Sequence, residues 1–245
     1  MELKIINMYP DILNLYGDIG NLICIKQRCN WRGIEVNIEN FTIDNEIAIK
    51  EADIILMGGG SHNSQKIISS HLLKQKKELK NYIDDGKVIL AISSSYQMFG
   101  KSYINTDYSD ENYQKIPSLE IFDIETYTQR DPLVGNTIIE NNLNLKPKEI
   151  IGFKNHSFGV YHDYTPLGSV KLGHGNNEQE QNEGMIYKNF IGSYLHGPLL
   201  PKNPHLADNI ILTALKNKYA IESLAKIDDT FEMNAHNTVI KRVLR

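Results

Sequence analysis

Apolar residues in the first hundred positions gather in short β-branched runs, separated by longer stretches with helical spacing. Four runs have the length of buried strands: Leu3 to Met8, Ile34 to Ile38, Asp53 to Met57 and Val88 to Ile92. Apolar residues recur every three or four positions from about 21 to 32 and from 63 to 84, which predicts helices. Strands that alternate with helices predict an α/β fold with a doubly wound, mostly parallel sheet. The ligand site of such a sheet lies at the carboxyl ends of its strands.

Turn and cap residues divide these elements. Asp18 is predicted to cap the first helix and Gly33 to end it. The second helical stretch is predicted to continue unbroken to the turn at Gly86. Beyond Gly100, residues 104–120 are polar and rich in tyrosine and asparagine, which predicts a loop. We expect a small mixed β extension and two closing helices, with strands near 121–128, 134–140, 149–153, 169–173 and 185–194 and helices near 204–216 and 231–243.

Composition places the chain among globular proteins. It has 245 residues, of which 41% are hydrophobic and 23% charged, and no linker or repeat divides it, so we expect one domain over residues 1–245. A net charge of −4 argues against a nucleic-acid partner. No apolar run reaches the ~20 residues that span a bilayer, and the chain opens on a strand rather than a signal peptide. Cys24 and Cys29 are too few for a disulfide framework or zinc site, which favours buried thiols and a cytoplasmic location.

The stretch from Val88 to Gly100 has the pattern of a strand that turns sharply into a helix. Ser93 is its central residue, with the small Ala91 two positions before and Ser95 two positions after, as in a nucleophile elbow. The central side chain of an elbow lies near a helix N-terminus, where backbone N–H groups favour negative charge. An ordinary strand-to-helix turn with a capping serine has the same local pattern. This stretch alone therefore leaves both interpretations open.

Two further features lie at predicted strand ends. Gly58-Gly-Gly60 follows the third strand, where exposed N–H groups suit an oxyanion hole or a phosphate cradle, although a tight turn has the same composition. His196 ends a strand-like run, within reach of a nucleophile on a neighbouring strand end. A loop histidine without a chemical role fits the local pattern equally. Because position 198 is proline, no acid two residues after His196 orients its imidazole.

The order of these features is more specific than any one of them. A triple glycine after the third strand, an elbow after the fourth and a late histidine together resemble a class I glutamine amidotransferase. The branch it resembles is the cobyric-acid-synthase-like (CobB/CobQ-like) one, and within it the amidotransferase subunits of lipid II isoglutaminyl synthase. The resemblance covers roughly residues 1–220, and further matching segments are Leu13-Asn-Leu-Tyr-Gly-Asp-Ile-Gly-Asn21, Thr128-Gln-Arg130, Ile151-Gly-Phe-Lys-Asn-His156, Tyr161-His-Asp163, Gly173-His-Gly-Asn-Asn177 and Gly192-Ser-Tyr-Leu-His-Gly-Pro198 with Leu200-Pro-Lys-Asn203.

The resemblance implies a flavodoxin-like fold and a role for each site residue. Ser93 occupies the nucleophile position, which is a cysteine in the family, and His196 matches the base. The N–H groups of Gly59 and Ser94 match the oxyanion donors. The residues that match substrate-binding positions are Arg130 and Gln97. The resemblance implies no metal or cofactor in this chain.

The resemblance also implies a partner. A subunit of this kind hydrolyses glutamine and passes ammonia to a Mur-ligase-like (MurT-like) subunit, with which it forms a heterodimer. The partner uses ATP and Mg²⁺ to activate the α-carboxyl of D-glutamate in the lipid II stem peptide, which gives D-isoglutamine.

The sequence departs from the family's motifs around the expected pocket. The Cys-Gly-Gly of the family is Ser93-Ser-Ser95 here, and an arginine that the family carries near position 159 is glycine. A thiol with a pKa near ~8.5 is readily converted to a thiolate, whereas an alcohol needs a well-oriented base. We therefore expect impaired glutamine hydrolysis. We also expect Ser93→Cys alone to restore nothing, because the two following serines add Cβ atoms to a strained elbow.

Three functional hypotheses remain at this point. The first is an amidotransferase subunit with weakened or lost glutaminase activity. The second is a Ser-His hydrolase or peptidase on the same fold, and the third is a non-catalytic structural subunit. Arg130 and the segment from Leu195 to Asn203 favour the first, because a new hydrolase has no need to retain both.

Overall fold

The computed structural model describes residues 1–45, 47–105 and 114–244. Its main feature is a six-stranded sheet with the order β11-β12-β4-β3-β1-β2, in which all neighbours from β12 to β2 are parallel and β11 is antiparallel. These strands are β1 (Glu2–Met8), β2 (Glu35–Phe41), β3 (Ile54–Met57), β4 (Val88–Ile92), β11 (Met185–Tyr187) and β12 (Phe190–Ser193). The predicted α/β class with a doubly wound, mostly parallel sheet is confirmed.

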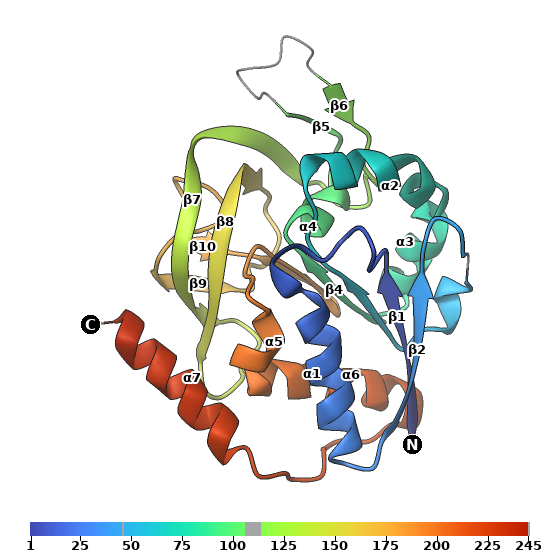
Figure 1. Ribbon diagram of the computed structural model, residues 1–245, viewed down its shortest axis with the longest axis vertical. Helices are drawn as coiled ribbons and strands as arrows, with labels where there is room; N and C mark the ends of the chain where they lie inside the picture. Colours follow the sequence, from blue (N-terminus) through green and yellow to red (C-terminus); the bar gives the residue numbers. More distant parts are fainter. Residues whose placement is uncertain (46, 106–113, 245) are drawn as a thin grey trace.

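Helices cover both faces of this sheet (Figure 1). One face carries α1 (Ile19–Asn30), α5 (Leu199–Lys202) and α6 (Pro204–Tyr219), and the other carries α2 (His62–Lys74), α3 (Lys76–Asp84) and α4 (Ser94–Met98). Alternate residues of β4 point to opposite faces: Ile89 and Ala91 join one apolar cluster, while Val88, Leu90 and Ile92 join the other. Burial on both faces explains why the run is apolar throughout rather than alternating.

The prediction of one unbroken helix from 63 to 84 is wrong, because α2 and α3 are separate helices that meet at Gln75. The positions between Leu73 and Leu79 are all polar. No apolar side chain in this stretch packs against the core, and the chain forms two helices there instead of one.

Asp18 lies at the N-cap position of α1, as predicted, but it does not act there as a side-chain cap. Asp18 makes no capping hydrogen bond through its side chain. The side chain of Asn14 accepts the N–H of Ile19 instead, at 2.9 Å. The short 3₁₀ helix η1 (Leu15–Gly17) precedes α1, and a second one, η2 (Ile49–Glu51), precedes β3.

A second sheet forms the predicted β extension, but it is antiparallel throughout rather than mixed, and the strands predicted near 185–194 pair in the main sheet as β11 and β12. Its order is β10-β9-β7-β8, from β7 (Glu125–Asn141), β8 (Glu149–Tyr161), β9 (Gly168–Leu172) and β10 (Asn182–Glu183). The two strands predicted at 121–128 and 134–140 are one long strand with an irregular stretch between Thr128 and Leu133. Within the predicted loop 104–120, residues 106–113 lie outside the described residues, and its two sides pair as β5 (Tyr103–Asn105) and β6 (Gln114–Ile116).

The chain closes as predicted, with α6 followed by α7 (Thr230–Val243), which lies against α5 (Figure 1). Within the described ranges, no helix combines the length and apolar character that crossing a bilayer requires. Cys24 and Cys29 are free thiols, and burial raises the pKa of each to about 12. Both thiols are therefore protonated near neutral pH.

The parallel strands bring three predicted site segments to one edge of the main sheet. β3 ends directly before Gly58, β4 directly before Ser93, and β12 three residues before His196. A bridge between Phe153 and His196 attaches the second sheet to this edge.

Candidate active site

Ser93 occupies a strained position between β4 and α4. Its backbone has φ 57° and ψ −121°, which a non-glycine residue adopts only where its surroundings impose it. Backbone hydrogen bonds hold it there: the Ser93 N–H donates to the Ser193 carbonyl at 2.7 Å, and its own carbonyl accepts the N–H groups of Tyr96 at 2.9 Å and Gln97 at 3.4 Å. This geometry is that of a nucleophile elbow.

His196 is fully buried, three residues after the end of β12. Its backbone exchanges two hydrogen bonds with Phe153, at 2.8 and 3.1 Å, which fixes the ring relative to the second sheet. Nδ1 lies 3.4 Å from Oδ1 of Asp18, and Nε2 has no hydrogen-bond partner in the described part of the chain. A carboxylate beside Nδ1 favours the tautomer that carries its proton there, and this leaves Nε2 free to accept a proton.

Gly59 lies between Ser93 and His196. A Cβ atom at Gly59 would lie 2.9 Å from Cε1 of His196, 3.0 Å from Cβ of Ser93 and 3.2 Å from Oδ2 of Asp18. Three side chains from distant parts of the sequence therefore meet around one Cα atom, and only glycine leaves room for them.

The Asp18 carboxylate joins two of these groups. Oδ2 accepts the N–H of Gly59 at 2.6 Å, while Oδ1 faces the ring of His196. The predicted oxyanion donor at Gly59 is thus engaged by Asp18 in this arrangement. Asp18 is the residue that sequence reasoning missed, because an acid next to a helix start has the pattern of a cap.

The serines that follow Ser93 contact the glycine turn. Oγ of Ser94 accepts the N–H of Gly60 at 2.8 Å, and Oγ of Ser95 donates to the carbonyl of Gly58 at 2.5 Å. Ser94 is also the first residue of α4, whose N–H has no acceptor within the helix. That N–H follows the nucleophile position, where an elbow supplies an oxyanion donor.

Comparison with known proteins identifies the family. Residues 4–204 match the CobB/CobQ-like glutamine amidotransferase domain. The chain belongs to this family. It is 38% identical over 244 residues to the lipid II isoglutaminyl synthase (glutamine-hydrolyzing) subunit GatD of Staphylococcus aureus, covering 100% of this chain and 97% of that protein. The subunit of the same name from Streptococcus pneumoniae is 34% identical over 221 residues, which cover 89% and 82% of the two chains.

A solved structure has the same fold. A glutamine amidotransferase from Thermotoga maritima superposes with a TM-score of 0.56, over 99% of this chain and 94% of that one, at 14% sequence identity.

The two residues predicted to bind substrate differ in their surroundings. Arg130 is exposed, in the irregular stretch of β7. Gln97 is fully buried, where its Nε2 donates to Oε1 of Gln65 at 2.9 Å and its Oε1 accepts the hydroxyl of Tyr194. In this CobB/CobQ-like chain the Gln97 amide therefore links α4 to α2 and to the segment before His196.

A buried ion pair supports the same segment. Lys154 and Glu183 are both fully buried, with their charged atoms 3.5 Å apart. Glu183 accepts the N–H of Tyr194 at 2.9 Å and the hydroxyl of Ser193 at 3.2 Å, so it fixes the residues immediately before His196. His156 stacks on the Tyr194 ring at 3.9 Å, and burial lowers the pKa of this histidine well below its usual range.

Tyr16 covers the other side of His196. Its backbone is left-handed, with φ 58°, and its ring meets the His196 ring edge-on at 4.9 Å between centroids. Its hydroxyl accepts a hydrogen bond from Nδ2 of Asn155 at 2.5 Å. With 42% of its surface exposed, Tyr16 separates the buried imidazole from solvent.

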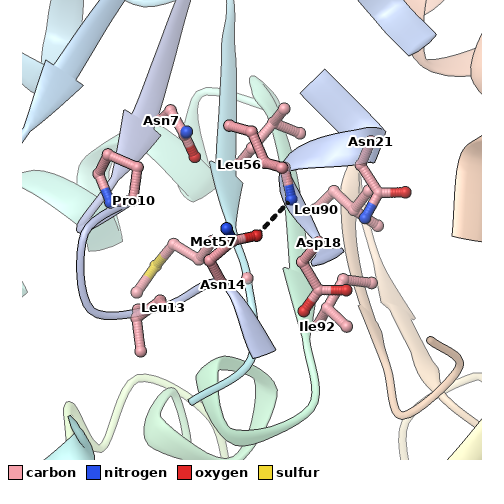
Figure 2. Close-up of a pocket in the computed structure, with 12 residues that line it drawn as sticks. Asn7, Pro10, Leu13, Asn14, Asp18, Asn21, Leu56, Met57, Leu90 and Ile92 are labelled. Atoms are coloured by element: carbon pink, nitrogen blue, oxygen red, sulfur yellow. Dashed lines mark hydrogen bonds between the residues drawn. The ribbon is translucent and has the colours of Figure 1, made fainter. Parts of the chain in front are cut away.

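A small cavity lies behind Asp18 (Figure 2). Its polar lining comes from Asn7 of β1, from Asn14 and Asp18 in the segment between β1 and α1, and from Asn21 of α1. The volume of about 10 Å³ is room for one water and far too small for glutamine. The described residues contain no cluster of three or more His, Cys, Asp or Glu side chains suited to a metal ion.

Proposed function

We propose that this chain is the glutamine amidotransferase subunit of a lipid II isoglutaminyl synthase. It releases ammonia from glutamine, and a Mur-ligase-like partner uses that ammonia with ATP and Mg²⁺ to amidate D-glutamate of the peptidoglycan stem. The relatives in two species that carry this name cover nearly the whole chain and support the assignment. The observation that carries the chemistry is the meeting of Ser93, His196 and Asp18 around Gly59.

The proposed reaction is acyl transfer through Ser93. Its hydroxyl attacks the side-chain amide carbon of glutamine while His196 Nε2 takes the hydroxyl proton. The negative charge on the carbonyl oxygen faces the N–H of Ser94. His196 then gives its proton to the departing nitrogen. Ammonia is released, and the γ-glutamyl group remains bound to Ser93 as an ester. Water, activated by His196, hydrolyses this ester to glutamate.

The proposed rate is lower than that of a cysteine enzyme, because Ser93 cannot form a stable anion near neutral pH. Asp18 offsets part of this disadvantage, since a carboxylate beside Nδ1 stabilises the imidazolium that forms during attack. We therefore propose impaired rather than absent hydrolysis.

A second candidate is supported by the same three side chains. Ser93, His196 and Asp18 are the residue types of a serine hydrolase, which needs no ligase partner. Activity of the isolated chain on simple esters or peptides, without glutamine hydrolysis, is the outcome expected for that candidate. Failure of every such assay with intact partner binding is the outcome expected for a non-catalytic subunit.

The test uses the chain co-expressed with a Mur-ligase-like protein from the same genome. We expect a heterodimer that amidates a D-glutamate-containing stem peptide with glutamine as nitrogen donor. Ser93→Ala is expected to abolish glutamine-dependent amidation but to leave amidation with ammonium chloride unchanged. If no complex forms, or if Ser93→Ala has no effect on glutamine use, the proposal is wrong.

The rim of the site offers a surface for that partner. Tyr16, whose ring meets that of His196, exposes 42% of its surface, and its chain neighbour Leu15 exposes 40%. Exposed apolar side chains at the mouth of a site that must pass on ammonia suit a protein contact. The cytoplasmic location of the complex stays a prediction.

A further inference from the structure

Side chains of the site make three hydrogen bonds to the Gly58-Gly-Gly60 turn, and the Gly59 carbonyl also accepts the N–H of Leu15 at 2.9 Å. The Gly58 carbonyl accepts from Ser95 Oγ at 2.5 Å, and the Gly60 N–H donates to Ser94 Oγ at 2.8 Å. Between these two, the Gly59 N–H donates to Asp18 Oδ2 at 2.6 Å. All three bonds are buried. Each glycine of the turn thus contributes one polar backbone group to a side chain of the site.

The opposite side of the turn is closely packed. A Cβ atom at Gly58 would lie 2.4 Å from the carbonyl oxygen of Leu13, and one at Gly60 would lie 2.6 Å from Cδ2 of Leu13. The turn is therefore held between Leu13 on one side and the two serine hydroxyls on the other. Its position sets where the Gly59 N–H points.

We propose that Ser94 and Ser95 are positioning residues for the catalytic base. Their hydroxyls fix the glycine turn, the turn presents the Gly59 N–H to Asp18, and Asp18 in turn orients His196 toward Ser93. This inference rests on the proposed function, in which His196 activates the residue at position 93. It assigns to the two hydroxyls a role opposite to the obstruction expected from the sequence.

A serine nucleophile depends on a well-oriented base, which these hydroxyls would help to provide. The family motif noted above has Cys-Gly-Gly where this chain has Ser93-Ser-Ser95. An alcohol depends on an oriented base more than a thiol does, because it is un-ionised before attack. Hydroxyls that fix the orienting acid are therefore useful where the nucleophile is serine.

Other titratable groups lie near His196, and none of them is changed in the variants of the test below. Tyr16 meets its ring edge-on, His156 stacks on the ring of Tyr194, two residues before His196, and the Lys154–Glu183 pair supports the preceding residues. None of them touches the glycine turn through a hydrogen bond in the described residues.

The test uses Ser93→Cys as a reporter, without glutamine or partner. Alkylation of the new thiol by iodoacetamide is followed from pH 5 to 10, which gives its thiolate pKa. Burial raises the pKa of Cys24 and Cys29 to about 12, and alkylation of the wild-type chain, which has both thiols and none at position 93, is subtracted as the background. We expect the reporter pKa to lie below the ordinary value of ~8.5, as for a thiol beside an oriented histidine.

Ser94→Ala and Ser95→Ala are then added separately to the reporter. We expect each to raise the thiolate pKa by about one unit and to slow alkylation at pH 7 about tenfold. Ser94→Gly, which restores the glycine of the family motif, is expected to do the same. The matched control is Ser69→Ala, which removes a hydroxyl bond of 2.7 Å to the Pro117 carbonyl, away from the elbow.

The outcomes separate a positioning role from a structural one. If Ser94→Ala, Ser94→Gly and Ser95→Ala lower the melting temperature but leave the thiolate pKa unchanged, the two hydroxyls have only a structural role. This result overturns the inference but not the proposed function. A reporter with an ordinary thiol pKa before any serine is removed overturns the role of His196, and the inference with it. A shift in the Ser69→Ala control equal to that of the elbow variants also overturns the inference.

Discussion

Replacing Asp18 by asparagine tests the orientation of His196 with little change of shape. The asparagine oxygen can still accept the Gly59 N–H, which the carboxylate accepts at 2.6 Å. The group opposite Nδ1 of His196 loses its charge, however, so the imidazolium that forms when Ser93 attacks is less stabilised. The variant is therefore expected to fold and to lose activity.

The size of the effect follows from the geometry. Asp18 Oδ1 lies 3.4 Å from His196 Nδ1, and a pair of unit charges at that distance interacts with about 5 kcal/mol at an effective dielectric constant of about 20. The distance exceeds the ~2.8 Å of a strong charge-assisted hydrogen bond. We therefore expect about half of this value to appear in the barrier, which lowers kcat about 10²-fold.

The assay is ammonia release from glutamine by the complex, at saturating glutamine. Asp53→Asn is the matched control, because the Asp53 carboxylate also accepts a backbone N–H, that of Lys4 at 2.8 Å, far from Ser93. We expect the control to keep its kcat. An Asp18→Asn variant that melts like the wild type and keeps its kcat would refute the assignment of Asp18 as the orienting acid.

Three further predictions concern Ser93, Gly59 and His205. Ser93→Cys alone is expected to raise glutamine hydrolysis at least tenfold, because Ser94 and Ser95 support the glycine turn rather than obstruct it; an unchanged rate in the ammonia assay contradicts this. Gly59→Ala is expected to abolish hydrolysis, since the new Cβ lies 2.9 Å from His196 Cε1; a variant with normal turnover shows that the site is looser than described. Burial lowers the pKa of His205 to about 4, so the unfolded chain binds a proton between pH 6.5 and 4 that the folded chain does not, and stability falls as pH falls through this window. The loss of unfolding free energy between pH 7 and pH 4, measured with urea, is expected to be about 3 kcal/mol smaller in His205→Gln. An unchanged pH dependence contradicts the low pKa of His205.

The elbow and the strands around it were predictable because burial determines their residue types. β4 is covered on both faces, so its five residues are all apolar, and the chain then needs small residues to turn at Ser93. The same reasoning located Gly58 and His196 at strand ends. These features depend on local pattern and on the geometry common to parallel sheets.

Asp18 was not predictable in the same way. Its two partners are Gly59, 41 positions away in the sequence, and His196, 178 positions away. A local sequence pattern does not show that residues so far apart are in contact. The hydrogen bonds of the Ser94 and Ser95 hydroxyls were not predictable for a similar reason, since the backbone groups that they bind lie on a different strand end. The break between α2 and α3 at Gln75 was not predicted, because apolar residues with helical spacing follow it.

Loss of the family arginine near position 159 also has a structural counterpart. A Cβ atom at Gly159 would lie 2.1 Å from Nε2 of Gln129, so the Gln129 amide occupies the space where a longer side chain would begin. Restoring arginine there requires Gln129 to move. An arginine at position 159 would therefore displace a buried side chain.

The central claim is that Ser93, activated by His196, hydrolyses glutamine in the complex with the ligase partner. The most direct measurement is the steady-state rate of ammonia release from glutamine by the complex, compared with the same complex carrying Ser93→Ala or His196→Ala. We predict a measurable rate below about 1 per second for the wild type, the low end for enzymes, and none above background for either variant. Equal ammonia release by all three complexes, or none by any of them, contradicts the account.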